Sequence, residues 1–324
     1  MEGRRRRRRR FDLGAEADRI FGGEPEAAEP VFGDSEDEEL ELFLDERPPP
    51  HRERRRGGLR GETARRILWV VPWIVFAIAI IVAGGWIFAL AMVGLGLIGL
   101  REYFQMVESS RPITAAGFIT LAAMILAARQ FDSAFNVLLA ASAGFAVMFL
   151  FALDRKRREG VTIAFAVTLL GIFWIGVPLV HAVLLRDLPH HGGALLINVL
   201  VGTFATDTAA YAAGRLFGTH RITPRLSPNK TLEGVIGGVV GGTMAFWFAG
   251  LYQDWLPGVD ALVMGACIAL LAPLGDLFES MLKRDLGVKD TGSIFGPHGG
   301  LLDRLDAVLF TVVAGYYLSV AFVY

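Results

Sequence analysis

Long apolar segments separated by short polar breaks dominate the chain from Leu68 onward. Each segment is long enough to cross a bilayer as a helix, which takes about 20 residues. The pattern predicts an all-α polytopic membrane protein with about nine transmembrane helices. The first two share the apolar run 68–100, divided near Gly84 and Gly85, and the others are predicted near 112–128, 134–153, 160–184, 193–214, 234–252, 260–282 and 302–323.

Composition supports this interpretation and sets the first 66 residues apart. The 324 residues are 53% hydrophobic, with a mean hydropathy of +0.46, which excludes an ordinary soluble domain. Arginine fills every position from 4 to 10, and acidic residues crowd positions 34–46. Such a segment cannot form a core, so we expect residues 1–66 to be a disordered, charged cytoplasmic tail.

The distribution of lysine and arginine predicts the orientation in the membrane. These residues gather on alternate loops, near 65–66, 101–111, 155–158, 215–230 and 283–304. The positive-inside rule assigns those loops to the cytoplasm. With an odd number of spans, the amino end is then cytoplasmic and the carboxyl end, Tyr324, lies outside.

The segment 280–306 carries the densest mixture of charged residues and glycines in the apolar part of the chain. It contains bases, carboxylates and the glycines at 292, 296, 299 and 300. Ionised groups near a bilayer are costly, so this cluster indicates a functional site. Glycines let the backbone approach an oxyanion closely, and the combination is suited to phosphate and a metal ion.

Two further motifs precede this segment. In 207–218, Asp207, Tyr211, Arg215 and two glycines fall on one face of a predicted helix. Packing of small residues, with Asp207 paired to Arg215, is the alternative explanation. In 227–234, Thr231 is placed to cap the following helix, and Lys230 is suited to phosphate.

The acidic residues favour magnesium over zinc. Asp276 and Lys283 recur at helical spacing with Glu279 or Ser280, and Asp303 and Asp306 follow at the start of the last span. Neither histidine nor the single cysteine, Cys267, forms a cluster with zinc-ligand spacing. Carboxylate oxygens without thiols are typical of Mg²⁺ sites completed by substrate phosphates.

These three motifs, in this order, resemble those of the phosphatidate cytidylyltransferase family, also called CDP-diacylglycerol synthases. The resemblance covers roughly residues 67–324 and is most specific over 280–306. One departure is Gly296-Pro297-His298, where many members read Pro-Gly-His. The resemblance implies transfer of CMP from CTP to phosphatidate, with N-terminal transmembrane helices at 67–190 and catalytic helices and cytoplasmic loops at 191–324.

The resemblance also assigns roles to individual residues. The implied metal ligands are Asp276 and Asp303, with Asp290 and Asp306 as weaker candidates, for Mg²⁺ with a second cation left open. The implied catalytic residues are Asp276, Lys283, Arg284, Lys289, Asp290, His298, Asp303 and Arg304. The implied substrate-binding residues are Asp207, Tyr211, Arg215, Ser227, Lys230, Thr231, Ser280, Gly299 and Gly300.

The expected partners are CTP, phosphatidate and membrane lipid; no nucleic acid is expected, and a homodimer is left open. The expected location is a bacterial inner membrane, with the active site facing the cytoplasm. A CTP-dependent lipid kinase of the polyprenol kinase type is the main alternative function. A polytopic transporter is less favoured because no internal repeat is visible, and a CDP-alcohol phosphotransferase is less favoured because its run of spaced aspartates is missing around Asp207.

Overall fold

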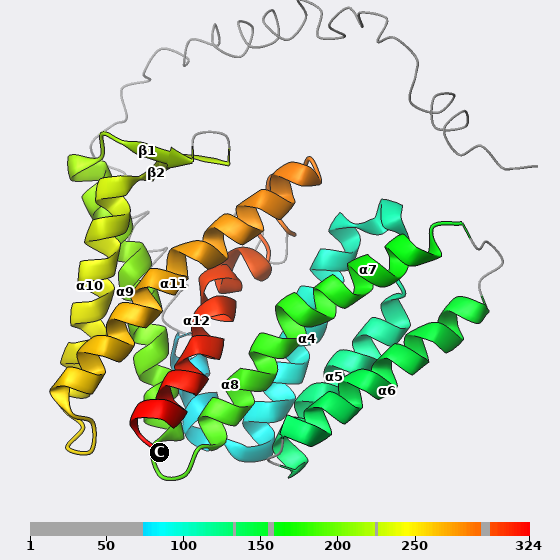
Figure 1. Cartoon of the computed structure of the whole chain (residues 1–324), viewed down its shortest axis with the longest axis horizontal. Helices are drawn as coiled ribbons and strands as arrows, with labels where there is room; N and C mark the ends of the chain where they lie inside the picture. The colour runs from blue at the N-terminus through cyan, green and yellow to red at the C-terminus, as the bar shows by residue number, and fades with distance from the viewer. Residues whose placement is uncertain (1–73, 132–133, 155–158, 224–225, 293–298) are drawn as a thin grey trace, which may run out of the picture. The chain divides into compact units, whose positions relative to one another are not determined.

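The computed structural model describes residues 74–131, 134–154, 159–223, 226–292 and 299–324, all within the unit Ile67–Tyr324 (Figure 1). The predicted tail and His298 lie outside the described residues. The elements in chain order are α4 (Gly85–Met106), η1 (Glu108–Ser110), α5 (Thr114–Phe131), α6 (Ala134–Leu153), α7 (Val161–Gly171), η2 (Ile172–Gly176), α8 (Val177–Asp187), α9 (Gly192–Phe217), β1 (Arg221–Thr223), β2 (Ser227–Thr231), α10 (Leu232–Gly250), α11 (Gly258–Asp285) and α12 (Leu302–Phe322).

The prediction of an all-α polytopic membrane protein is confirmed. Within the described ranges, eight helices are long and apolar enough to cross a membrane, and Ile74–Ala83 is a shorter apolar helix. The long run 68–100 is interrupted at Gly84 and Gly85, which have φ of 61° and 53°. This left-handed backbone suits glycine, so the two glycines end one helix and begin the next.

The connections between helices gather at two opposite ends (Figure 1). At one end lie η1, the β1–β2 hairpin and the end of α11. At the other end, His191 stacks on Trp255 with ring centroids 4.0 Å apart, and the Tyr324 hydroxyl donates to the carbonyl of Pro189. We call the first the hairpin end, because the strands β1 and β2 pair there in antiparallel fashion.

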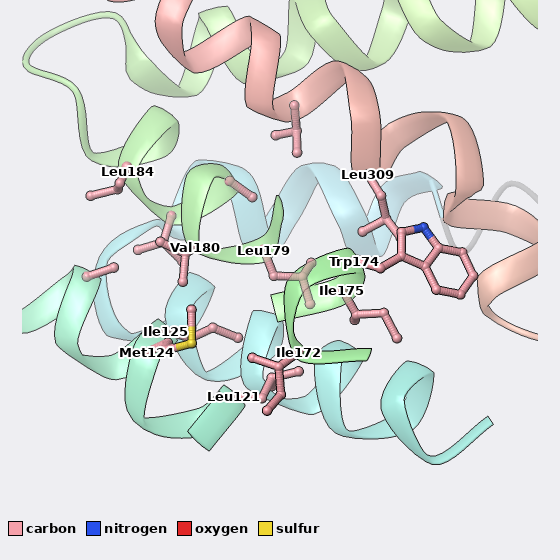
Figure 2. Packing of buried hydrophobic residues seen from close by; sticks show 14 of the residues in the cluster. Leu121, Met124, Ile125, Ile172, Trp174, Ile175, Leu179, Val180, Leu184 and Leu309 are labelled. Atoms are coloured by element: carbon pink, nitrogen blue, oxygen red, sulfur yellow. The ribbon is translucent and has the colours of Figure 1, made fainter. Parts of the chain in front are cut away.

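A buried apolar core joins the amino-terminal helices to the carboxyl-terminal ones. Figure 2 shows part of it, including Leu121 and Ile125 of α5 and Leu179 of α8. Trp174, in the π-helical segment η2, makes edge contacts with Tyr103 of α4 and Phe278 of α11. Large aromatic rings bury much apolar surface, so this row of contacts holds α4, η2 and α11 together.

Helices α9 and α10 pack through small residues. A Cβ atom added at Gly242 would lie 1.9 Å from Thr206 Oγ1 and 2.9 Å from the carbonyl oxygen of Gly202. In a membrane, such close backbone approach replaces the hydrophobic effect as the source of helix association. The pairing fixes the position of Asp207, which lies one residue after Thr206.

We predict that Gly242→Ala destabilises the protein by about 1–3 kcal/mol, because the methyl group forces α9 and α10 apart. Gly94→Ala is the matched control, since a Cβ there meets nothing within 4 Å. It should be neutral or stabilising by about 0.5–1 kcal/mol. Unfolding in mixed detergent micelles measures both; equal stability of the two variants would contradict the close packing.

Candidate active site

The candidate site begins where α11 crosses α12 at the hairpin end. A Cβ at Gly275 would lie 2.3 Å from the carbonyl oxygen of Asp306 and 2.8 Å from the Cα of Ala307. The two backbones can approach this closely only because position 275 lacks a side chain. The next residue, Asp276, is thereby placed beside Asp306, which also neighbours Glu279.

Lys230, in strand β2 of the hairpin, lies beside this group of acidic residues, which we call the carboxylate cluster. Its Nζ lies 3.0 Å from Asp276 Oδ2, and both side chains are more than two-thirds buried. Asp207 of α9 neighbours Asp276 and Lys230. Residues from three separate motifs of the sequence therefore lie in one cluster.

Lys283 forms the second ion-paired centre. Its Nζ lies 2.8 Å from Asp303 Oδ1 and 3.3 Å from Glu279 Oε1, and Glu279 is only 1% exposed. Glu279 and Lys283 are one helical turn apart on α11, whereas Asp303 is on α12. Lys283 thus joins the two helices through carboxylates on each.

Asp303 is held from the other side by the segment that precedes α12. Its Oδ2 accepts hydrogen bonds from the Thr291 amide at 3.0 Å, the Thr291 hydroxyl at 3.0 Å and the Gly300 amide at 2.7 Å. Gly299 has φ of 84°, and a Cβ there would lie 2.7 Å from Asp303 Oδ2. The other oxygen, Oδ1, accepts only from Lys283 among these contacts, so its remaining lone pair could accept a further ligand.

The charge balance of this carboxylate cluster fits a divalent cation. Among the described residues of the cluster, five carboxyl groups share two lysines; the acids are Asp207, Asp276, Glu279, Asp303 and Asp306. Crowded carboxylates without enough counter-charge are costly in a membrane protein. No three His, Cys, Asp or Glu side chains in the described ranges converge tightly enough to hold an ion by themselves. Mg²⁺ commonly takes only one or two carboxylates from the protein and its other ligands from water and phosphate, so this cluster fits Mg²⁺.

Other predicted residues lie around this cluster with different environments. Tyr211 is 69% exposed and accepts a hydrogen bond from Arg215 at 3.1 Å. Thr231 is the N-cap of α10 and accepts from the Gly234 amide at 3.2 Å, which confirms its predicted capping role. Lys289, Asp290 and Arg304 are exposed, and Ser227 and Ser280 are half-buried. Arg284 donates to the carbonyl of Leu226 at 3.4 Å.

For α9, the helical spacing placed Asp207, Tyr211 and Arg215 on a single polar face, with small-residue packing and an Asp207–Arg215 pair as the alternative. The pair of that alternative is not formed. Instead, Arg215 bonds Tyr211 at the surface, and Asp207 turns toward Lys230 and Asp276. The packing of α9 on α10 continues along these turns, since a Cβ at Gly237 would lie 2.3 Å from the Cβ of Ala213. Tyr211 and Arg215 lie on the exposed side of α9.

The sequence-based assignment omitted three residues that the structure places at or next to the cluster: Glu102, Glu279 and Thr291. Glu279 was noted at helical spacing to Lys283 but was given no role. Thr291 lies inside the segment 280–306 but is uncharged. Glu102 is a buried carboxylate on α4, in the half of the chain that was not expected to contribute.

The fold and the cluster define a polytopic membrane protein with a group of carboxylates and lysines toward one end of its helices. Residues 64–322 match the Cytidylyltransferase family, so the chain belongs to that family.

Three named relatives support the same family. A phosphatidate cytidylyltransferase of Synechocystis sp. is 32% identical over 79% of this chain and 96% of its own length. Phosphatidate cytidylyltransferase 4, chloroplastic, of Arabidopsis thaliana is 30% identical over 73% of this chain and 68% of its own length. A phosphatidate cytidylyltransferase of Mycobacterium tuberculosis is 40% identical over 40% of this chain and 39% of its own length.

We predict that Lys283→Met destabilises the protein by about 2–4 kcal/mol, because it leaves Glu279 and Asp303 without their shared cation. Adding Glu279→Gln should restore part of the loss, since one unpaired charge is then removed. Lys289→Met is the control: that side chain is exposed, so its effect should stay within about 0.5 kcal/mol. Unfolding in detergent measures all three, and equal effects of the two lysine variants would contradict the bridging role.

Proposed function

We propose that this protein transfers CMP from CTP to phosphatidate, giving CDP-diacylglycerol and pyrophosphate. The observation that carries the proposal is the carboxylate and lysine cluster of α9, β2, α11 and α12 in a chain of the Cytidylyltransferase family. The names of the Synechocystis, Arabidopsis and Mycobacterium relatives support this choice of substrates.

The reaction needs no nucleophile from the protein. A phosphate oxygen of phosphatidate attacks the α-phosphorus of CTP, a new P–O bond forms, and the bond to the bridging oxygen breaks as pyrophosphate leaves. The protein must hold two polyanions together and neutralise the charge that develops on their oxygens. Lys230 and Lys283 supply positive charge inside the cluster, and Arg284, Lys289 and Arg304 supply it around the cluster.

We assign Mg²⁺ to the cluster, where Asp276 and Asp303 would hold it together with Asp306, a neighbour of Asp276. When bound, the ion would neutralise phosphate charge and polarise the oxygens around the reacting phosphorus. Asp276 and Asp303 are held by Lys230 and Lys283 at 3.0 and 2.8 Å. Those two lysines therefore keep the carboxylates in place and compensate part of their charge.

The hairpin end is the cytoplasmic end in this proposal. Among the described residues it carries Arg101 and Arg111, and the basic residues at 215, 221, 230, 283, 284, 289 and 304, which the positive-inside rule favours on the cytoplasmic side. Soluble CTP would then reach the cluster from the cytoplasm, and phosphatidate from the inner leaflet of a bacterial plasma membrane. The amino end is cytoplasmic and the carboxyl end outside if Ile74–Ala83 belongs to a ninth span.

We predict that the purified protein transfers label from α-³²P CTP, and none from γ-³²P CTP, into a lipid product when phosphatidate is present. Removing divalent ions with a chelator should stop the transfer, and Mg²⁺ should restore it. Label in lipid from the γ position would indicate a lipid kinase instead. Label in lipid from neither position would contradict both enzymatic readings.

We predict that Asp303→Asn lowers turnover by at least about 100-fold while the protein remains folded. The amide NH₂ of Asn must face either Lys283 or the donors of Thr291 and Gly300, so it cannot reproduce the present geometry. Asp254→Asn is the control, because Asp254 is exposed at the opposite end. Pyrophosphate release and thermal unfolding measure the two properties, and near-normal turnover would remove Asp303 from the site.

A further inference from the structure

Glu102 is a buried acid on α4 that the chemistry above does not use. It is 1% exposed, yet its carboxylate faces residues 199 and 200 positions later in the chain. Its Oε1 accepts from the Leu301 amide at 2.9 Å, and its Oε2 accepts from the Leu302 amide at 3.0 Å. A buried carboxylate is tolerated only where donors satisfy it, and here two backbone amides do so.

The two amides belong to the start of α12. The first amides of a helix have no acceptor within the helix, and α12 has no side-chain cap at its N-cap residue, Leu301. A negative charge is favoured at this position because the helix dipole is positive there. Glu102, although far from α12 in the sequence, therefore caps this helix. In most helices a residue next to the first turn has that role.

The backbone before α12 is shaped to fit this carboxylate. A Cβ at Gly292 would lie 2.6 Å from Glu102 Oε1, and a Cβ at Gly300 would lie 2.6 Å from Glu102 Oε2. Any other residue at either position would push the segment away from Glu102. The two glycines thus allow the chain to close around the carboxylate on both sides of the stretch that contains His298.

Thr291 connects this anchor to the cluster. Its hydroxyl lies 3.4 Å from Glu102 Oε2 and 3.0 Å from Asp303 Oδ2, and its amide also donates to Asp303. Asp303 in turn holds Lys283 at 2.8 Å. A continuous series of contacts therefore runs from α4 to the lysine that we assign to phosphate binding.

We propose that Glu102 is a positioning residue of the active site: it anchors Leu301, Leu302 and Thr291, and so fixes the orientation of Asp303 and Lys283. If Glu102 served only as a helix cap, its contacts with the amides at the start of α12 would be sufficient. Contact with Thr291, which also holds Asp303, extends the anchor to the site. The kinetic part of the test rests on the proposed function, whereas the exchange part does not.

Glu102→Gln in the full chain tests the proposal, with Glu108→Gln as the matched control. Glu108 is exposed in η1, at the same end of the molecule. The Gln amide keeps the size of the side chain but places an NH₂ group against one of its present donors. We expect kcat to fall about tenfold to a hundredfold, while KM for CTP changes less than about threefold. The control should stay within about twofold of the wild type in both constants.

Hydrogen–deuterium exchange supplies the reading that is independent of activity. In Glu102→Gln, the peptide that covers Leu301 and Leu302 should exchange about tenfold faster, because one amide loses its acceptor and the other keeps only a neutral one. Peptides from the opposite end, around 251–257, should exchange as in the wild type. Faster exchange with a selective loss of kcat supports the positioning role.

Two outcomes would overturn it: unchanged kcat, whether or not KM rises, or unchanged exchange. If Glu102→Gln does not fold, Thr291→Val takes its place, because it removes the bridging hydroxyl and keeps the Thr291 amide; kcat should then fall about fivefold. If the wild type itself transfers no label, the proposed function fails, and the exchange measurement alone decides whether Glu102 is the anchor.

Discussion

The contact between α11 and α12 at Gly275 is the constraint on which the site depends. It lets two helices cross with almost no space between their backbones, and it does so one residue before Asp276 and directly beside Asp306. Carboxylates brought together in this way repel one another, particularly near a bilayer. Lys230 and Lys283 offset part of that repulsion, each from a position that also links separate elements: hairpin to α11, and α11 to α12. The same contact thus creates the cluster and requires its counter-charges.

This arrangement explains why the functional residues lie at one end of the helices. Apolar spans alone would satisfy the membrane, and most of their surface is apolar. The hairpin end instead combines the ends of α9, α11 and α12 with the short strands β1 and β2. A water-soluble nucleotide and a lipid phosphate can meet only at such a boundary. The opposite end is held by ordinary contacts, such as the stacking of His191 on Trp255.

The amino-terminal helices contribute more than a scaffold. The aromatic contacts of Tyr103, Trp174 and Phe278 tie α4 to α11 within the core. One residue before Tyr103, Glu102 reaches the start of α12. Adjacent residues of α4 are therefore linked to both helices that carry the cluster: Glu102 contacts α12 directly, and Tyr103 reaches α11 through Trp174. This gives a physical reason to regard the helices before α9 as part of the site rather than as a separate membrane anchor.

The sequence by itself determined the class of fold, the approximate positions of the helices and the three motifs of the site, because apolar length, helical spacing and local charge are properties of short segments. It also identified the break at Gly84 and Gly85 and the cap at Thr231. Only the tertiary structure decided that Asp207 faces Lys230 while Tyr211 and Arg215 remain at the surface, since that depends on how α9 packs against α10. The same holds for Glu102, whose acceptor role depends on contacts made 199 and 200 residues later. No periodicity within one helix can reveal a partner of that kind, because it is set by the crossing of helices in space.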